Sequence, residues 1–451
     1  MLGIPHPYLT ASIPGIGGEI KQSPEDFVVA EVPLYSPCGQ GEHLYFEVEK
    51  VDLSTLEALE RLARELRVDV KDFGYAGLKD RKGITRQTFS ISRVPREEIE
   101  ALAIPQMRVL WVKPHSNKLR IGHLRGNHFR ITIRGVAAGS ERVTEQILGI
   151  IQERGVPNYY GPQRFGTRGD AHRIGRSFLK GDDRSAVRRI LGHPSAAEHN
   201  PNVVEAREKF MAGDLRAALN LYPLAYREER RLVQYLIHSR DNYAGAKRAL
   251  RASTSKLYFT AYQSYLFNLA LAKRMETAEG DLGRFYEEDV AFLHRNGACF
   301  RVKDLAEAEA RSKTFEISPS GPIFGMKMLV PGGVAGEIER SILERERISP
   351  VDFNQLMPKL KLEGGRRPFR VRCESLSWKL DGPDLRIEFF LPKGSYATTL
   401  LRELMKNEAV PEGYYEEGEE EKYGLWRPPC QTGTAVAADR SGLPADDDID
   451  G

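Results

Sequence analysis

The sequence predicts an α+β protein in which one domain is interrupted by a second domain. The opening third mixes strand and helix patterns, the stretch from about Tyr160 to Gly365 is rich in arginine-studded helical patterns, and strand patterns return near Phe369. A chain of 451 residues is also too long for one ordinary hydrophobic core. We predict a first domain at residues 1–159 and 366–438, an inserted domain at 160–365, and a disordered acidic tail at 439–451.

The opening third contains two strand patterns and two helix patterns. His43 to Lys50 is rich in aromatic and β-branched residues, and Phe129 to Arg134 alternates apolar and basic residues, so both ranges are expected to be strands. Ser54 to Leu66 begins with the spacing of a capping box and continues with apolar residues at helical intervals. A second helix is expected from Val143 to Ile151.

The remaining patterns lie in the middle and near the end of the chain. The segments VRCESLSW and LRIEFFL have strand character, and a final helix is expected from Thr398 to Lys406. In the middle, helices are expected at residues 186–191, 202–212, 215–221, 227–237 and 240–256.

The net charge of +3 hides an uneven distribution. The stretch from Gly161 to Lys256 contains 19 Lys and Arg against 10 Asp and Glu, whereas the stretch from Pro411 to the end contains 11 acidic and three basic residues. The middle therefore has the composition of a protein that binds a polyanion. A merely solvated basic face would show the same surplus.

Several classes of protein are disfavoured by the composition and by missing motifs. No run approaches the roughly 18 apolar residues of a membrane-spanning helix, and no signal-peptide pattern is visible. The four cysteines have neither zinc-ligand spacing nor a disulfide framework. The motifs GxxxxGK[ST], GxSxG and HExxH are absent, and no GxGxxG follows a strand. We therefore expect a cytoplasmic protein without metal or cofactor, and a monomer by default.

A glycine-rich segment from Phe73 to Gln87 (FGYAGLKDRKGITRQ) contains a candidate nucleophile. Asp80 lies there between Lys79 and Arg81, in what its glycines indicate is a loop. Flanking cations favour an ionised carboxylate and attract a phosphate backbone. Such a carboxylate can act as a nucleophile or a base next to RNA. The alternative is an ordinary exposed loop with alternating charges.

Two further segments are poorly explained by folding alone. Gly155 to Asp170 (GVPNYYGPQRFGTRGD) interleaves aromatic residues and arginines, which suits the stacking of unpaired bases and phosphate contacts, although a packed loop would need aromatics too. Leu391 to Leu404 (LPKGSYATTLLREL) passes from a strand through a turn to a helix whose N-terminus favours an anion. An ordinary strand–turn–helix connection is the alternative there.

Taken together, these segments resemble the TruD family of tRNA pseudouridine synthases, and the AGLKD and NYYGPQRFG stretches are the most specific. The matching stretches follow the family order and are KQSPEDFVVAE (21–31), GYAGLKDRKGITRQ (74–87), RGNHFRITIR (125–134), GVPNYYGPQRFG (155–166), AYQSYLFN (261–268), GPIFG (321–325) and LPKGSYATTLLREL (391–404).

The resemblance implies a fold and a reaction. The fold is a pseudouridine-synthase catalytic domain with a mixed, largely antiparallel sheet, interrupted by an inserted α/β TRUD domain. The reaction is the isomerisation of uridine, at position 13 in the D-arm of tRNA, to pseudouridine by an intramolecular transferase that needs no cofactor. The family's catalytic aspartate falls on Asp80, and its substrate-contacting residues fall on Phe27, Asn127, Phe129 and Tyr396, the last in place of a common Phe.

Basic residues around these motifs are expected to contact RNA. Lys79 would hold Asp80 ionised or bind substrate phosphate, and the RNA-binding residues are expected to be Lys21, Arg81, Arg164 and Arg168. Two other functions stay open at this point. One is an RNA-binding protein that kept the fold without activity, and the other is a methyltransferase, whose activity would depend on added S-adenosylmethionine.

Overall fold

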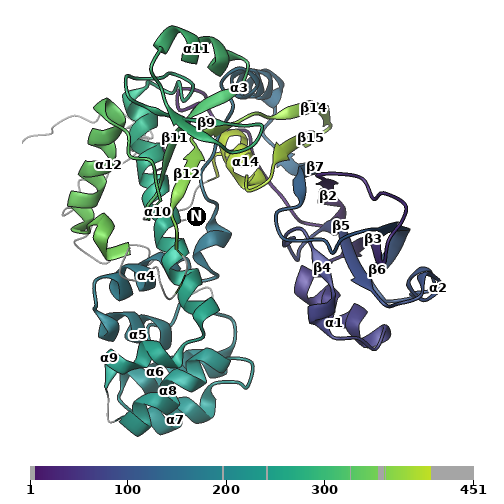
Figure 1. Ribbon diagram of the computed structural model, residues 1–451, viewed down its shortest axis with the longest axis vertical. Helices are drawn as coiled ribbons and strands as arrows, with labels where there is room; N and C mark the ends of the chain where they lie inside the picture. The colour runs from purple at the N-terminus through teal and green to yellow at the C-terminus, as the bar shows by residue number, and fades with distance from the viewer. Residues whose placement is uncertain are drawn as a thin grey trace, which may run out of the picture. The chain divides into compact units, whose positions relative to one another are not determined.

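The computed structural model describes residues 6–195, 198–239, 242–325, 327–353, 360 and 362–407 (Figure 1). The described residues all belong to one compact unit. The predicted acidic tail at 439–451, and the part of the predicted first domain beyond residue 407, lie outside the described residues.

The larger sheet combines strands from near both ends of the described chain. All of its pairings are antiparallel except the parallel pairing of β2 with β5, and β1 (Gly17–Glu19) and β4 (Gly74–Tyr75) pair with β7 and β5 beside the main path. The mixed, largely antiparallel sheet of the predicted α+β class is therefore confirmed. The main path is β14 (Glu374–Asp381), β15 (Asp384–Pro392), β7 (Leu124–Val136), β2 (Phe27–Pro33), β5 (Ile84–Ser92), β3 (His43–Val51) and β6 (Met107–His115).

Strand β7 joins the early and late strands of this sheet. Phe129 in β7 is opposite Val29 in β2 on one side and opposite Phe389 in β15 on the other. The two regions of strand character that flank the middle of the sequence thus meet in one sheet. The boundaries that we assign to the two domains stay a prediction.

Helices cover this sheet through two separate cores. Helix α1 (Thr55–Glu65) begins with the predicted capping box, in which Ser54 Oγ accepts the Glu57 N–H. Its leucines pack on Phe46 and Phe89 of the sheet, while α3 (Ser140–Arg154) and α14 (Ala397–Met405) pack in a second core around β7 and β15. A short helix, α2 (Arg96–Glu100), precedes β6.

The middle of the chain forms a helical cluster with its own core, centred on Phe178, Leu191, Phe210 and Leu236. A 26-residue helix, α10 (Ala252–Thr277), then packs against α4 and continues beside β11 and α12 (Figure 1). Among the described helices, none combines the length and the apolar character needed to cross a bilayer. The cluster contains α4 (Ala171–Leu179), α5 (Asp183–Leu191), α6 (Pro201–Met211), α7 (Leu215–Leu221), α8 (Arg227–Ser239) and α9 (Tyr243–Ala246).

One predicted helix is interrupted. The range 240–256 was expected to be a single helix, but from residue 242 onward it contains α9, a 3-10 turn at Lys247–Ala249 and the start of α10. Leu250 and Arg251 have extended backbones, with ψ of 147° at both, so the chain changes direction there. Burial of Leu250 in the helical core accounts for the break, which helical periodicity alone does not reveal.

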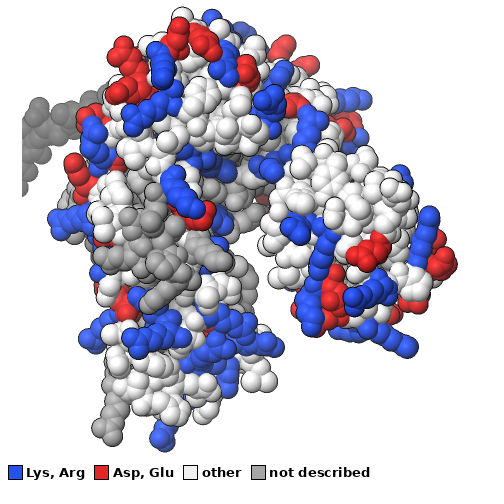
Figure 2. All heavy atoms as spheres, in the orientation of Figure 1, with Lys and Arg blue, Asp and Glu red and all other residues white. Residues whose placement is uncertain are grey.

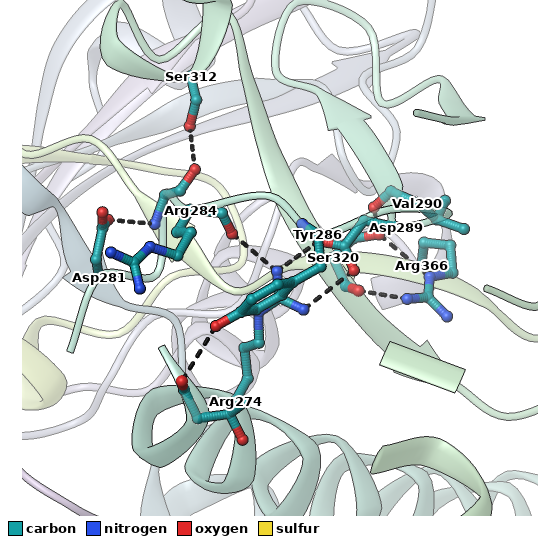
Figure 3. Close-up of polar contacts among 11 residues, drawn as sticks. Arg274, Asp281, Arg284, Tyr286, Asp289, Val290, Ser312, Ser320 and Arg366 are labelled. Atoms are coloured by element: carbon teal, nitrogen blue, oxygen red, sulfur yellow. Dashed lines mark hydrogen bonds and ion pairs between the residues drawn. The ribbon is translucent and has the colours of Figure 1, made fainter. Parts of the chain in front are cut away.

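A small antiparallel sheet follows α10, and a buried ion pair joins it to that helix (Figure 3). Arg274 of α10 forms a two-pronged pair with Asp289, whose Oδ2 also accepts the Tyr286 N–H at 2.9 Å. Arg366 of β12 pairs with Glu339 at 2.6 Å and donates to Ser320 Oγ at 3.1 Å. The first pair joins α10 to the residue before β9, and the second joins β12 to α12. The sheet order is β10 (Cys299–Arg301), β9 (Val290–Leu293), β11 (Ile317–Ile323) and β12 (Gly365–Pro368), and the accompanying helices are α11 (Leu305–Lys313) and α12 (Gly333–Glu346). A separate two-stranded pairing joins β8 (Val156–Pro157) to β13 (Arg370–Val371).

Candidate active site

The loop that carries Asp80 connects β4 to β5 and is fixed by its own backbone. Gly83 has φ of +124°, and a Cβ there would lie 2.3 Å from the backbone oxygen of Phe27. Only glycine therefore fits at the end of the loop. The Gly83 N–H donates to Asp52 Oδ1 at 2.9 Å, and the Asp52 N–H donates back to the Gly83 oxygen at 3.0 Å.

Buried polar side chains fix the beginning of the same loop. Gln87 of β5 donates its side-chain N–H to the Gly77 oxygen at 2.5 Å. Thr55 Oγ1 accepts the Lys79 N–H at 2.8 Å and donates to Gln87 Oε1 at 3.0 Å. Because Gln87 and Thr55 are buried, these bonds hold the backbone around Asp80 in one conformation.

The Asp80 carboxylate is partly open and has one partner on each oxygen. Its side chain is 32% exposed, Oδ2 lies 3.3 Å from Lys21 Nζ, and Oδ1 accepts a hydrogen bond from Gln163 Nε2 at 2.9 Å. Lys21 also places its ammonium 4.0 Å from the centre of the Phe27 ring and has φ of 62°, which is uncommon for a residue with a Cβ. Asp80 is thus neither buried among apolar side chains nor remote from cations.

Lys79 is directed into the protein, where it pairs with Glu31. Its ammonium lies 2.6 Å from Glu31 Oε2, and the two side chains are 5% and 1% exposed. The partner of Asp80 is therefore Lys21, which comes from a segment 59 residues earlier in the chain. The substrate-binding role predicted for Lys79 remains a prediction.

Asn127 lies on the central strand of the sheet beside this ion pair. It is opposite Glu31 in β2 and Leu391 in β15, so the Asn127 and Glu31 side chains share a face of the sheet. The Asn127 Oδ1 atom is buried and accepts no hydrogen bond from any described residue. A buried polar atom without a partner is costly, and other described side chains, such as Thr85 Oγ1 and Thr144 Oγ1, share this property.

The two predicted phenylalanines are part of the core. Phe27 and Phe129 are buried, their ring centroids lie 6.4 Å apart, and Phe129 stacks on Phe389 at 5.2 Å. Phe27 also lies under the Lys21 ammonium that contacts Asp80. Both rings belong to the hydrophobic core of the large sheet. Their direct contact with a base stays a prediction.

Tyr396 caps α14 near Asp80 and contacts the aromatic loop. Burial raises the pKa of the Tyr396 phenol, and the negative charge of Asp80 contributes to the rise. The Tyr160 ring lies 6.2 Å from the Tyr396 ring in an edge orientation, and the Arg367 guanidinium lies 4.1 Å from the Tyr160 centroid. A Cβ on Gly161 would lie 3.0 Å from the Tyr396 ring, so the two segments are closely packed.

The three predicted RNA-binding arginines differ in how available they are. Arg81 is 68% exposed and forms a surface ion pair with Glu57 at 3.3 Å. Arg164 donates to Ser264 Oγ at 2.9 Å. Arg168 is only 13% exposed and lies 2.9 Å from Asp170, and burial lowers its pKa. Figure 2 shows further Lys and Arg side chains gathered around the helical cluster near α5. An RNA contact by any of the three stays a prediction.

Sequence reasoning did not identify two partners in this site. Gln163 lies in a 3-10 turn (Pro162–Phe165) within the segment GVPNYYGPQRFGTRGD. A function was predicted for the arginines and aromatic residues of this segment, and none for Gln163. Glu31 ends a motif that matches the family, and its alternation with Phe27 and Val29 is a signal that could have indicated a position on the buried face. A buried acid at that position indicates a buried cation nearby. The contacts themselves depend on tertiary structure.

No group of three or more His, Cys, Asp or Glu side chains among the described residues is arranged to hold a metal ion. The polar groups that the structure brings together are the carboxylates of Asp80 and Glu31, the ammonium groups of Lys21 and Lys79, and the amides of Asn127 and Gln163. The expectation that the reaction requires no metal or cofactor stays a prediction.

Comparison with known proteins agrees with the arrangement of these motifs. The family described as tRNA pseudouridine synthase D (TruD) matches residues 3–404. The tRNA pseudouridine synthase D of Geotalea daltonii is 46% identical over 402 residues, which cover 89% of this chain and 100% of the relative. That of Geobacter metallireducens is 45% identical, with coverage of 88% and 97%.

A solved structure extends the similarity to the fold. The crystal structure assigned to TruD from Methanosarcina mazei aligns with a TM-score of 0.75 and 29% identity, and the alignment covers 90% of this chain and 97% of that one. Sequence and structure therefore match over nearly the whole described chain. This protein belongs to the TruD family, the family of tRNA pseudouridine synthase D.

Proposed function

We propose that this protein isomerises uridine to pseudouridine in tRNA with Asp80 as the nucleophile. The observation that carries the proposal is the partly exposed Asp80 carboxylate, which is held between Lys21 and Gln163 on a fixed loop. Membership in the TruD family, with relatives named tRNA pseudouridine synthase D matched over almost their full length, supports the reaction and the tRNA substrate.

The reaction changes connectivity and conserves composition. The N1–C1′ bond of uridine breaks, the uracil turns, and a C5–C1′ bond forms. The proton on C5 is lost and N1 gains one, so nothing is oxidised, reduced or hydrolysed. Asp80 attacks either C1′ of the ribose or C6 of the base, and in both cases the carboxylate is released when pseudouridine is complete.

The contacts of Asp80 leave it able to react. A carboxylate oxygen can accept about two hydrogen bonds, and each oxygen of Asp80 accepts one, from Lys21 or from Gln163. One lone pair therefore remains on each oxygen. The two donors orient the carboxylate, and its side chain stays 32% exposed.

Asn127 is suited to hold the uracil. Its Oδ1 atom lacks a hydrogen-bond donor among the described residues, and the imide N3–H of uracil is a donor of the kind it lacks. We assign to Tyr396, Phe27 and Phe129 the role of contacting the base that leaves its stack. Base–aromatic stacking contributes about 1–3 kcal/mol per base.

The target position, uridine 13 in the D-arm, comes from the family resemblance. The other finer parts are expectations from the residues themselves: Lys79 would hold Asp80 ionised or contact a phosphate, and Lys21, Arg81, Arg164 and Arg168 would contact RNA. The protein would work in the cytoplasm as a monomer, with neither metal nor cofactor.

The test is Asp80→Asn assayed on unmodified tRNA carrying tritium at C5 of its uridines. We expect tritium release to fall to background, because the amide is a poor nucleophile. Binding of the same tRNA should stay within several-fold of the unaltered protein. The matched control is Asp381→Asn, which alters a surface ion pair with Arg386 and should leave tritium release unchanged.

Two results would reject parts of the proposal. Substantial pseudouridine formation by purified Asp80→Asn protein would remove the nucleophile assignment. Binding of tRNA without any isomerisation by the unaltered protein would indicate a silent RNA-binding protein instead.

A further inference from the structure

Leu78 is a large apolar side chain exposed two residues before Asp80. It is 67% exposed, on the same loop as the proposed nucleophile. Single exposed leucines are common on protein surfaces, so exposure by itself indicates nothing. What distinguishes Leu78 is how its neighbours are held.

The residues on both sides of Leu78 are anchored into the protein. The Gly77 oxygen accepts a hydrogen bond from Gln87, and the Lys79 N–H donates to Thr55. The Lys79 side chain is directed inward to its buried ion pair with Glu31. The backbone therefore cannot rotate Leu78 into the core without breaking these contacts, and its side chain is held outward.

A second exposed apolar residue lies on a loop attached to the same segment. Ile121 is 76% exposed, and the next residue, Gly122, donates its N–H to the Ala76 oxygen at 2.7 Å. This bond joins the loop of Ile121 to the segment that begins two residues before Leu78. Two exposed apolar side chains thus lie on loops that a backbone hydrogen bond joins, and one of them is two residues before Asp80.

An exposed apolar side chain near Asp80 could assist the unstacking of a uridine in the proposed tRNA substrate. A uridine in folded RNA must leave its stack before its C1′, C5 and C6 atoms can be reached, at a cost of roughly a few kcal/mol. Proteins that unstack nucleic acids commonly insert Leu, Ile, Met or Phe between bases. A leucine makes no directional hydrogen bond, so it can replace a base against any neighbour.

We propose that Leu78 enters the base stack of the tRNA next to the target uridine and occupies space that the extruded base leaves. This inference rests on the proposed isomerase function and adds a substrate-contacting residue to it. Leu78 would stabilise the extruded state, and Asp80 would then act on the extruded nucleotide.

The decisive experiment separates base extrusion from chemistry. It uses Asp80→Asn protein and tRNA that carries 2-aminopurine beside the target uridine, because 2-aminopurine brightens when it is unstacked. We expect a fluorescence rise with Asp80→Asn and a much smaller rise with Asp80→Asn/Leu78→Ala at saturating protein. The matched control is Asp80→Asn/Leu34→Ala, since Leu34 is also exposed, at 55%, and lies on another segment.

Activity of the single variants provides a second measurement. On folded tRNA, Leu78→Ala should lower kcat/KM about tenfold, because part of the extrusion cost is no longer offset. Leu78→Met should stay within about threefold of the unaltered protein, since methionine also fits between bases. On tRNA altered so that the target uridine is already unpaired and unstacked, Leu78→Ala and the unaltered protein should differ little.

The outcomes bear on different claims. Equal fluorescence rises with and without Leu78, or an equal loss of activity on stacked and unstacked substrates, would overturn the role of Leu78 and leave the isomerase proposal intact. Absence of isomerisation by the unaltered protein on every substrate would overturn the isomerase proposal instead.

Discussion

Two groups of cations and carboxylates in this protein use the same residue types in opposite ways. Arg274 and Asp289, beneath the small sheet, are 1% and 2% exposed, and both carboxylate oxygens are bound by the guanidinium (Figure 3). Asp80 is 32% exposed, and each of its oxygens has a single donor. The Asp289 carboxylate is bound by Arg274 through both oxygens in the interior, whereas each Asp80 oxygen keeps a lone pair available.

The difference separates scaffold from site. Buried ion pairs are costly to break because the remaining charge has no partner, so the Arg274–Asp289 pair fixes α10 against the small sheet. A partly exposed pair contributes little to stability, so Asp80 and Lys21 can serve chemistry at little cost to the fold. Comparable substitutions in the two groups should therefore have separate consequences.

The largest effect on folding should come from Asp289→Asn. This change keeps the shape of the side chain and leaves the charge of Arg274 buried without compensation, so the free energy of unfolding should fall by about 3–5 kcal/mol. Urea denaturation measures the loss. Asp80→Asn and Asp381→Asn, the same substitution at a partly exposed and a surface pair, should each cost about 1 kcal/mol or less. Equal losses at all three positions would contradict the distinction.

The two lysines around the site should show the same contrast over a shorter distance. Lys79→Met leaves Glu31 charged and unpaired in the interior, so stability should fall by about 3 kcal/mol. Lys21→Met removes a partner from a partly exposed carboxylate, so stability should change by less than about 1 kcal/mol.

The two lysine variants should rank in the opposite order when activity, instead of stability, is measured. Per folded molecule, Lys21→Met should lower kcat more than Lys79→Met does, because Lys21 contacts Asp80 directly. Thermal unfolding and single-turnover tritium release on the same preparations measure both properties. A larger kcat loss for correctly folded Lys79→Met would support the role predicted for Lys79, which is to hold Asp80 ionised or to bind substrate phosphate.

Much of the fold could be predicted because its signals are local. The capping box of Ser54 and Glu57, the alternation in Phe129 to Arg134 and the break at Gly155 all lie within a few residues, and each is present in the structure. The interruption at Leu250 was missed because helical periodicity continues through it. Burial of Leu250 among distant helices, which no short window contains, decides the backbone there.

For the candidate site, the sequence predicted several of the residues but not which of them pair with one another. The family resemblance assigned Asp80, Asn127 and Tyr396 to the site, and Lys21 was expected to contact RNA, but charge alternation around Asp80 suggested Lys79 as its ionic partner. In the structure Lys79 forms an ion pair with Glu31, whereas Asp80 pairs with Lys21 and accepts a hydrogen bond from Gln163. Residues adjacent in sequence can thus pair with different segments, so the pairing of charges depends on the tertiary structure.

The smallest predicted effect is a dependence of stability on pH that comes from the buried carboxyl of Glu339. Burial raises the pKa of Glu339 to about 7 from its ordinary 4.5, although Arg366 opposes the rise. Between these two values the folded protein keeps a proton that the unfolded chain has lost, so the contribution of Glu339 to stability is present at low pH and is lost as pH rises towards 7.

Glu339→Gln removes the titration and nearly preserves the shape. Urea denaturation at a series of pH values from 5 to 8 should show a steeper loss of stability with rising pH in the unaltered protein than in Glu339→Gln. The matched control is Glu337→Gln, on the same helix, where an exposed carboxylate pairs with Arg340 and should leave the slope unchanged. Parallel pH profiles for all three proteins would mean that Glu339 stays ionised, and the Arg366–Glu339 pair would then resemble the Arg274–Asp289 pair as a permanently charged part of the scaffold.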